Sequence, residues 1–195
     1  MIILASASPR RKELLAGLGV DFEIITADTD ETCLLSDPVL YAEELAGRKG
    51  MAVYELIKET RGEEAALEAV IISADTVVAA EGEILGKPRD EEDALRMLSL
   101  LSGNTHSVVT GIGVIAGGVP HVSHSSTKVH VAPIPDEELR AYVASGDPMD
   151  KAGAYGIQGG FSRWVRGIEG CYFGVVGLPL NALNELYFKA VGKYL

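Results

Sequence analysis

Serines and cations crowd one short segment near the start of the chain. The apolar residues Met1–Ala5 predict a buried strand, and Ser8, which a proline follows, predicts the N-cap of a helix. Arg10, Arg11 and Lys12 then fill the first helical turn, where the helix dipole already places about half a positive charge. This pattern indicates an anion site built from backbone N–H groups, hydroxyls and guanidinium groups. We expect these cations to give the helix no stability until an anion binds.

One carboxylate interrupts the most apolar strand pattern of the chain. Asp75 lies within VIISADTVV, where burial is costly unless the carboxylate meets a metal, a cation or a reacting water. Asp28, Asp30 and Glu31 form an acidic loop, and a carboxylate from it beside Asp75 could hold a divalent ion through oxygen ligands. The alternatives are a paired structural aspartate and, for Asp28 above all, solvated loop charge.

Three lysines could add to the cationic segment. Lys49 lies in an expected helix, Lys87 precedes a proline, and Lys151 lies in a glycine-rich loop. Each alone is typical of a solvated surface. Together with Arg10 and Arg11, they could neutralise the several negative charges of a triphosphate.

The bulk composition limits the classes of partner. The 195 residues carry a formal net charge of −11, which argues against a nucleic-acid or anionic-membrane surface. Cys33 and Cys171 fit neither a disulfide framework nor a zinc site. The apolar start lacks a preceding basic segment, and Asp75 interrupts one of the longest apolar runs. We therefore expect a soluble, cytoplasmic protein without a nucleic-acid or membrane partner.

Strand and helix patterns alternate irregularly, which predicts an α/β protein with a mixed sheet. Strands are expected at Met1–Ala5, at Phe22–Thr26, on both sides of a turn at Glu81 and Gly82, at His106–Ala116, at Val119–Ala132, and twice within Arg163–Val176. Helices are expected from Pro9 to Gly17 or Gly19, from Pro38 behind an Asp37 cap towards Ile57, from Asp90 to Gly103, from an Asp136 cap to Gly146, and from Pro179 onward.

Six segments share their order with one known family. LASASPRRKELL, SADTVV, LGKPRD, LSGNTHSVVTG, DKAGAYGIQG and VVGLPL resemble the Maf family of nucleotide pyrophosphatases, over nearly the whole chain. The resemblance implies one domain over residues 1–195, with an elongated mixed sheet, flanking helices and two lobes around a cleft, like that of inosine triphosphate pyrophosphatase. It also implies hydrolysis of a nucleoside triphosphate to the monophosphate and pyrophosphate with a divalent cation, Mg²⁺ or Mn²⁺.

The resemblance also carries residue roles over to matching positions. It implies that Asp75 accepts a proton. We also expect Glu31 and Asp75 to hold or flank the metal ion and a water. We expect Arg11, Lys49 and Lys87 to hold the departing pyrophosphate, together with the helix N-terminus behind Ser8. The implied catalytic residues are Asp75, Glu31, Lys49 and Lys87, and the implied substrate-binding residues are Ser6, Ser8, Arg10, Arg11, Thr76 and Gln158.

Three positions separate the branches of that family. Arg10, Thr76 and Gln158 resemble the branch specific for dTTP and UTP, whereas the 7-methyl-GTP branch has Trp, Gln and Glu there. A glutamine amide can match the acceptor–donor–acceptor edge of uracil and thymine. We expect a nucleotide-pool house-cleaning role, with modified pyrimidine nucleotides also open as substrates. Two alternatives stay open, a 7-methyl-GTP pyrophosphatase and a nucleotide-binding regulator of cell division with little turnover.

The chain departs from the family pattern in two places. Gly50 stands where an alanine is common, and Cys171, Phe173 and Gly174 stand where polar residues are usual. We expect these departures to affect lobe packing and the contacts of a homodimer rather than the chemistry.

Overall fold

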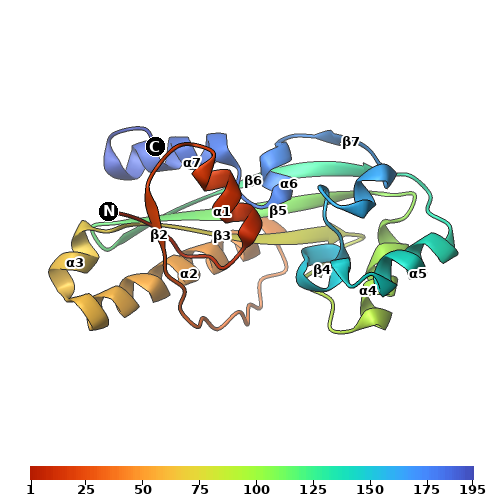
Figure 1. Cartoon of the computed structure of the whole chain (residues 1–195), viewed down its shortest axis with the longest axis horizontal. Coiled ribbons are helices and arrows are strands. Elements are labelled where there is room, and N and C mark those ends of the chain that lie inside the picture. The colour runs from red at the N-terminus through yellow and green to blue at the C-terminus, as the bar shows by residue number, and fades with distance from the viewer.

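A mixed seven-stranded sheet runs the length of the molecule (Figure 1). The computed structural model describes residues 1–195. Strand β1 pairs in parallel with β2 and β3, and every other strand pair is antiparallel, which confirms the predicted α/β class. The order is β2-β1-β3-β5-β6-β7, with β4 beside β3. The strands are β1 (Ile2–Leu4), β2 (Phe22–Ile24), β3 (Val70–Ala80), β4 (Glu83–Leu85), β5 (Thr105–Ala116), β6 (Val119–Val131) and β7 (Val165–Glu169).

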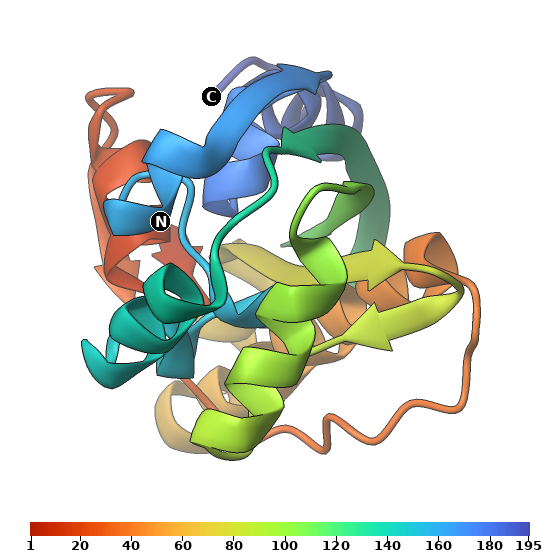
Figure 2. The ribbon, with the colours of Figure 1, turned by 90° about the vertical axis from the view of Figure 1, so that its right-hand side faces the viewer.

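Helices cover both faces of this sheet because apolar side chains of β3 point alternately to each face. Ile71 packs in one cluster with Val53 and Ile57 of the long helix α2, and Ile72 packs in another with Leu183 of α7. Figures 1 and 2 show α2 on one side of the sheet and α7 on the other. The helices are α1 (Pro9–Ala16), α2 (Pro38–Arg61), α3 (Glu63–Glu68), α4 (Glu91–Leu101), α5 (Asp136–Ala144), α6 (Tyr172–Val176) and α7 (Leu180–Val191), with 3₁₀ turns η1 (Asp147–Asp150), η2 (Ala152–Ala154) and η3 (Gly160–Trp164).

A third and larger cluster fills the opposite end of the molecule. Leu98 of α4, Leu139 of α5 and Phe161 of η3 pack there against Val78 of β3 and Val129 of β6. Strands of the same sheet therefore contribute to the cores at both ends. Both chain termini lie at the end that holds α3 and α7 (Figure 1).

Helix α2 approaches the sheet closely because glycines lie on both sides of the contact, Gly50 in the helix and Gly111 and Gly113 in β5. A Cβ atom on Gly50 would lie 2.8 Å from Cγ1 of Ile115 and 2.9 Å from Oγ of Ser73. The Ser73 hydroxyl donates to the carbonyl of Ala46 over 2.6 Å. Glycine costs a helix interior about 1 kcal/mol relative to alanine. At Gly50 the close packing explains why the common alanine is absent.

Helix starts agree well with the sequence patterns, with two local differences. Asp37 caps α2 and Asp90 caps α4, each accepting backbone N–H groups as predicted. Ser8 occupies the N-cap of α1, but its side chain makes no capping hydrogen bond. For α5 the predicted Asp136 cap is wrong, because Pro135 is the N-cap and Asp136 already belongs to the helix.

The prediction of two strands within Arg163–Val176 is wrong. Only β7 forms there, and Gly170, with φ of +130°, ends the extended chain. Cys171 then starts the short helix α6, because its Sγ accepts the N–H of Gly174 over 3.3 Å. An apolar run of this length fits a strand or a buried helix equally well, so the pattern alone did not separate them.

Two properties of the whole chain bear on its surroundings. Cys33 and Cys171 are both free thiols. None of the helices combines the length and the apolar composition needed to span a bilayer.

Candidate active site

The site lies at a gap in the edge of the sheet. Strand β1 pairs with β3 only as far as Ile72, and β4 pairs with it only from Val78, so residues 73–77 have no strand beside them on that edge. A cleft of about 990 Å³ opens over this gap. Asp75 and Thr76 point to opposite faces of the sheet, yet both line the cleft because it wraps around the open edge.

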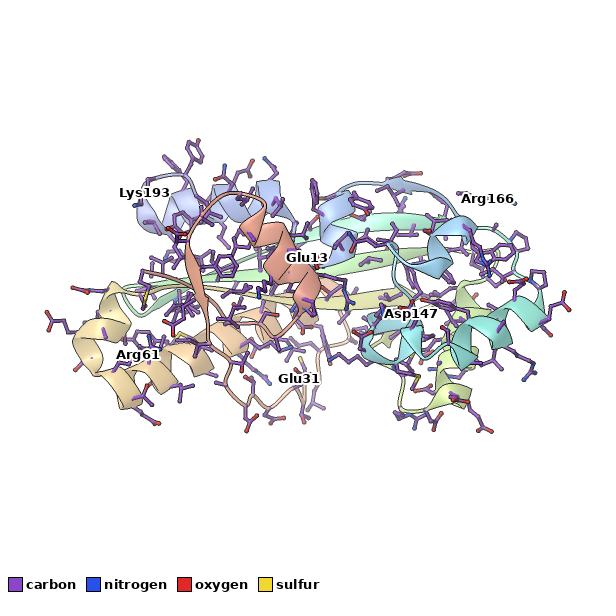
Figure 3. All side chains as sticks on the ribbon, in the orientation of Figure 1. Glu13, Glu31, Arg61, Asp147, Arg166 and Lys193 are labelled. Atoms are coloured by element: carbon purple, nitrogen blue, oxygen red, sulfur yellow. The ribbon has the colours of Figure 1, made fainter.

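Every site residue expected from the sequence lines this cleft. The start of α1, the loop that follows β2 and the glycine-rich segment after α5 surround it. Figure 3 labels Glu31 on the loop below α1 and Asp147 in the opposite half of the molecule. The residues brought together are Ser6, Ser8, Arg10, Arg11, Glu31, Lys49, Asp75, Thr76, Lys87 and Gln158.

The turn between β1 and α1 presents two hydroxyls. Oγ of Ser6 accepts the backbone N–H of Ser8 over 3.3 Å and so shapes the turn. The Ser8 hydroxyl caps nothing, and Pro9 occupies the first helical position. Hydroxyls and backbone N–H groups at a helix start suit an anion, as the sequence indicated.

Protein oxygens already accept most of the hydrogen bonds that the guanidinium group of Arg11 can donate. Its Nε donates to the carbonyl of Gly177 over 2.8 Å. Its Nη1 donates to the carbonyl of Ala74 over 2.7 Å and to Oγ of Ser6 over 3.2 Å. Its Nη2 donates to Oγ1 of Thr76 over 3.0 Å. The guanidinium therefore satisfies a carbonyl that β1 leaves unpaired at the sheet edge. The expectation of a first turn without stabilising contacts is wrong for this residue.

We expect Arg11→Glu to lower the free energy of unfolding by about 3 kcal/mol or more, because it leaves buried carbonyls unpaired and buries a like charge near Asp75. Burial already lowers the pKa of Arg11, and the carboxylate of Asp75 opposes that shift. Thermal melting measures the effect, with Lys12→Glu as the matched control in the same turn. Lys12 is exposed, so its replacement should stabilise by about 0.3–1 kcal/mol through the dipole. Equal melting temperatures for both variants would contradict this account.

Arg10 reaches across the cleft. Its Nη1 lies 3.4 Å from Oδ2 of Asp150, on the segment after α5. The side chains are 30% and 64% exposed, so this pair contributes little to stability. A bound phosphate would compete with Asp150 for Arg10.

Lys49 joins the two expected carboxylates. Its Nζ lies 2.6 Å from Oδ1 of Asp75 and 2.8 Å from Oε1 of Glu31. Burial opposes the charge of Lys49, but the two carboxylates outweigh it and raise the pKa, so Lys49 stays an ammonium. The hydrogen bond from Lys49 lowers the pKa of Glu31, with a smaller contribution from nearby Lys87. Lys87 itself is exposed. This arrangement keeps Glu31 ionised and orients Asp75.

The carboxylates meet the needs of a magnesium-type ion only in part. No group of three or more His, Cys, Asp or Glu side chains is arranged to hold a metal in this chain. Mg²⁺ commonly uses one or two carboxylates and takes its remaining ligands from substrate phosphates and water. Asp75 and Glu31 fit that limited role.

A hydrogen-bonded network holds the glycine-rich segment that carries Gln158. The Tyr142 hydroxyl donates to Oδ2 of Asp147 over 2.5 Å and accepts the N–H of Gly156 over 3.3 Å. Burial and the Asp147 carboxylate raise the pKa of Tyr142, so its hydroxyl stays protonated. Nζ of Lys151 lies 3.0 Å from Oδ1 of Asp147, so the protein already uses this cation.

Sequence reasoning missed the roles of Tyr142 and Asp147. Only one of their contacts could have been suspected from the sequence. It is the ion pair of Asp147 with Lys151, because these residues lie four positions apart. Gln158 itself is exposed at the cleft, so its amide can meet a ligand.

Comparisons with known proteins agree with this geometry. The family model described as Maf-like protein matches residues 1–190. The dTTP/UTP pyrophosphatase of Koribacter versatilis is 48% identical, over 97% of this chain and 94% of that protein. The protein of the same name from Thermococcus kodakarensis is 43% identical, over 99% and 100%, and that from Vibrio cholerae is 43% identical, over 96% and 97%. These matches cover both halves of the sheet and the residues that line the cleft, and we conclude that this chain belongs to the Maf family.

Proposed function

We propose that this chain is a nucleoside triphosphate pyrophosphatase that hydrolyses dTTP and UTP to the monophosphate and pyrophosphate, and so removes unwanted nucleotides from the pool. The observation that carries the proposal is Asp75, held by Lys49 at the open sheet edge inside a cleft that also holds serines and arginines. A volume of about 990 Å³ accommodates a nucleotide. Relatives that match nearly the whole chain carry the name dTTP/UTP pyrophosphatase.

In the proposed reaction, Asp75 accepts a proton from a water molecule. The water oxygen bonds to the α-phosphorus, and the bond from that phosphorus to the bridging oxygen of the β-phosphate breaks. Pyrophosphate leaves with the electron pair. Lys49 stays charged and keeps the Asp75 carboxylate in place through its 2.6 Å contact. Cations fixed before the reaction stabilise charge as it develops, which is commonly the largest catalytic contribution.

A divalent cation, Mg²⁺ or Mn²⁺, is part of the proposal. Asp75 and Glu31 are the residues that would hold it, together with the phosphates of the substrate. When bound, it would neutralise phosphate charge and make the phosphorus more electrophilic.

Base selection is assigned to the segment that carries Gln158. An amide can donate to a carbonyl and accept an N–H, which matches the pairing edge of uracil and thymine. Cytosine reverses part of that pattern and leaves a polar group unpaired. Such a mismatch costs about 1–3 kcal/mol, which corresponds to roughly 10- to 100-fold in kcat/KM.

The test is turnover of a panel of nucleoside triphosphates, including CTP, GTP and 7-methyl-GTP, with Mg²⁺, with Mn²⁺ and with a chelator. We expect UTP and dTTP to be preferred, pyrophosphate to be the first phosphate product, and the chelator to stop the reaction. In ¹⁸O-labelled water, the label should enter UMP because the water attacks the α-phosphorus.

Each other outcome removes a defined part of the proposal. Orthophosphate as the first product contradicts the pyrophosphatase assignment, and label in pyrophosphate moves the attack to the β-phosphorus. Equal rates for all nucleotides refute the base selection. A preference for 7-methyl-GTP selects the other branch, and tight binding without turnover selects a regulator.

Location and assembly complete the proposal. The free thiols Cys33 and Cys171 are in keeping with a reducing compartment, and we propose the cytoplasm. We also propose a homodimer, which light scattering on the purified protein measures directly.

A further inference from the structure

Two threonine hydroxyls lie behind Arg11 in a single chain of hydrogen bonds. Nη2 of Arg11 lies 3.0 Å from Oγ1 of Thr76. Oγ1 of Thr76 lies 2.9 Å from Oγ1 of Thr110, on the neighbouring strand β5. Thr110 is fully buried, and its hydroxyl lies 2.8 Å from the carbonyl oxygen of Gly174 in α6.

The direction of every bond in this chain follows from its ends. A carbonyl oxygen can only accept, so Thr110 must donate its single hydroxyl proton to the carbonyl oxygen of Gly174. In the bond between the two hydroxyls, Thr76 is therefore the donor. Thr76 then has no proton left for Arg11 and can only accept, which is what a guanidinium group requires. The bonds run one way, from Arg11 through Thr76 and Thr110 to Gly174.

This arrangement limits what Arg11 can offer a ligand. A guanidinium group has five N–H donors. Four of them are directed at the oxygens of Gly177, Ala74, Ser6 and Thr76. One N–H of Nη2 remains, on a residue that lines the cleft. Arg11 can thus give a phosphate one hydrogen bond rather than a two-pronged clamp.

We infer that Thr110 is a positioning residue, which fixes the hydroxyl of Thr76 and through it aims the one remaining N–H of Arg11 at the phosphates of the substrate. The inference rests on the proposed function for its ligand. It assigns Thr76 an indirect role, through Arg11, in place of contact with the base. The backbone carbonyl of Gly174 fixes the direction of these hydrogen bonds, and any residue type at this position would supply it.

The first test compares threonine variants that differ only in their hydroxyl. Thr110→Val keeps the size and the β-branch but removes the donor, and Thr110→Ser keeps the donor. Thr127→Val is the matched control, since Thr127 is 1% exposed, and its hydroxyl accepts the N–H of Cys171 over 2.9 Å and donates to its carbonyl over 3.2 Å. Both valine variants lose a buried hydroxyl that bonds to the α6 segment, but only one of these hydroxyls connects to Arg11.

We expect Thr110→Val to lower kcat/KM for UTP about 10-fold, Thr110→Ser to stay within about 3-fold of the unchanged protein, and Thr127→Val to stay within about 2-fold. In a calorimetric titration, inorganic pyrophosphate should bind Thr110→Val about 10-fold more weakly but bind Thr127→Val normally. Circular dichroism checks folding. If Thr110→Val does not fold, Thr110→Cys, with a weak S–H donor, takes its place in the same comparison.

A double-mutant cycle tests whether the two hydroxyls act as one unit. Thr76→Val alone should also weaken pyrophosphate binding about 10-fold. The Thr76→Val/Thr110→Val double variant should be no more than about 3-fold worse than the weaker single variant, whereas independent residues would multiply to about 100-fold.

Three results would overturn the inference. They are normal pyrophosphate binding by Thr110→Val, a loss of binding that Thr127→Val shares, and losses that multiply in the double variant. Calorimetric binding of inorganic pyrophosphate needs no turnover, so it tests this inference separately from the proposed function. The binding test can contradict the role of Thr110 while hydrolysis of UTP is observed. It can also support that role if no hydrolysis is observed.

Discussion

Asp75→Asn should lower kcat for UTP by about 10²–10⁴-fold while the protein keeps its fold, because an amide cannot accept the proton of the attacking water. Asp75 is 9% exposed, and its carboxylate lies 2.6 Å from Nζ of Lys49. Lys49 keeps Glu31 as a partner when the charge of Asp75 is removed, so the substitution does not leave a cation without a counter-charge. Single-turnover kinetics with UTP measures the chemical step, and circular dichroism measures the fold.

Asp93→Asn is the matched control for this experiment. Asp93 is a second buried aspartate, 6% exposed, whose carboxylate binds Arg89 and Arg96, and none of these three residues lines the cleft. Those partners hold the pKa of Asp93 down at about 2. Its replacement should cost stability but leave kcat within about 2-fold. An Asp75→Asn enzyme within a few-fold of the unchanged protein would show that Asp75 only pairs with Lys49.

Gly111→Ala should lower the free energy of unfolding by more than about 3 kcal/mol and the melting temperature by roughly 6–12 °C. A Cβ atom there would overlap the carbonyl group of Ala42 and lie 2.7 Å from the backbone nitrogen of Glu43. These are backbone atoms of α2, so no rotation of a side chain can relieve the overlap. Gly111 is also the register partner of Asp75, and a displaced α2 would carry Lys49 away from that carboxylate.

Gly167→Ala provides the control for this change. Gly167 lies in strand β7, and a Cβ atom there would meet nothing within 4 Å. Its replacement should change the free energy of unfolding by no more than about 0.5 kcal/mol. If the two alanine variants have the same melting temperature, α2 can move away from the sheet at no cost in free energy. The close packing then does not set the position of Lys49.

Features fixed by neighbouring residues were predictable from the sequence. The Asp37 and Asp90 caps and the turn at Glu81 and Gly82 all occur as expected. The family motifs also named the residues that the fold gathers into the cleft. In these cases the physical cause lies within a few residues of its effect, through capping bonds, turn geometry or alternating burial.

Features that depend on distant partners were not predictable. The bond from Arg11 to Gly177 joins positions 166 residues apart, and Arg10 meets Asp150 across 140 residues. The cations at the start of α1 therefore indicated a ligand, although oxygen atoms of the protein itself already pair with much of this charge. At Gly50 the sequence indicated only a departure from a common alanine, since it does not show what packs against this residue.

The long central strands determine how the cleft can open and close. β5 and β6 span 12 and 13 residues and run from one half of the molecule into the other (Figure 1). Their mutual hydrogen bonds continue past the cleft without a break, so the two halves share no hinge. We therefore expect the admission of substrate and the escape of products to depend on motion of the loop that carries Glu31 and of the segment that carries Gln158. Loop motions take place in nanoseconds to microseconds, whereas the hinge motions of whole domains take microseconds to milliseconds.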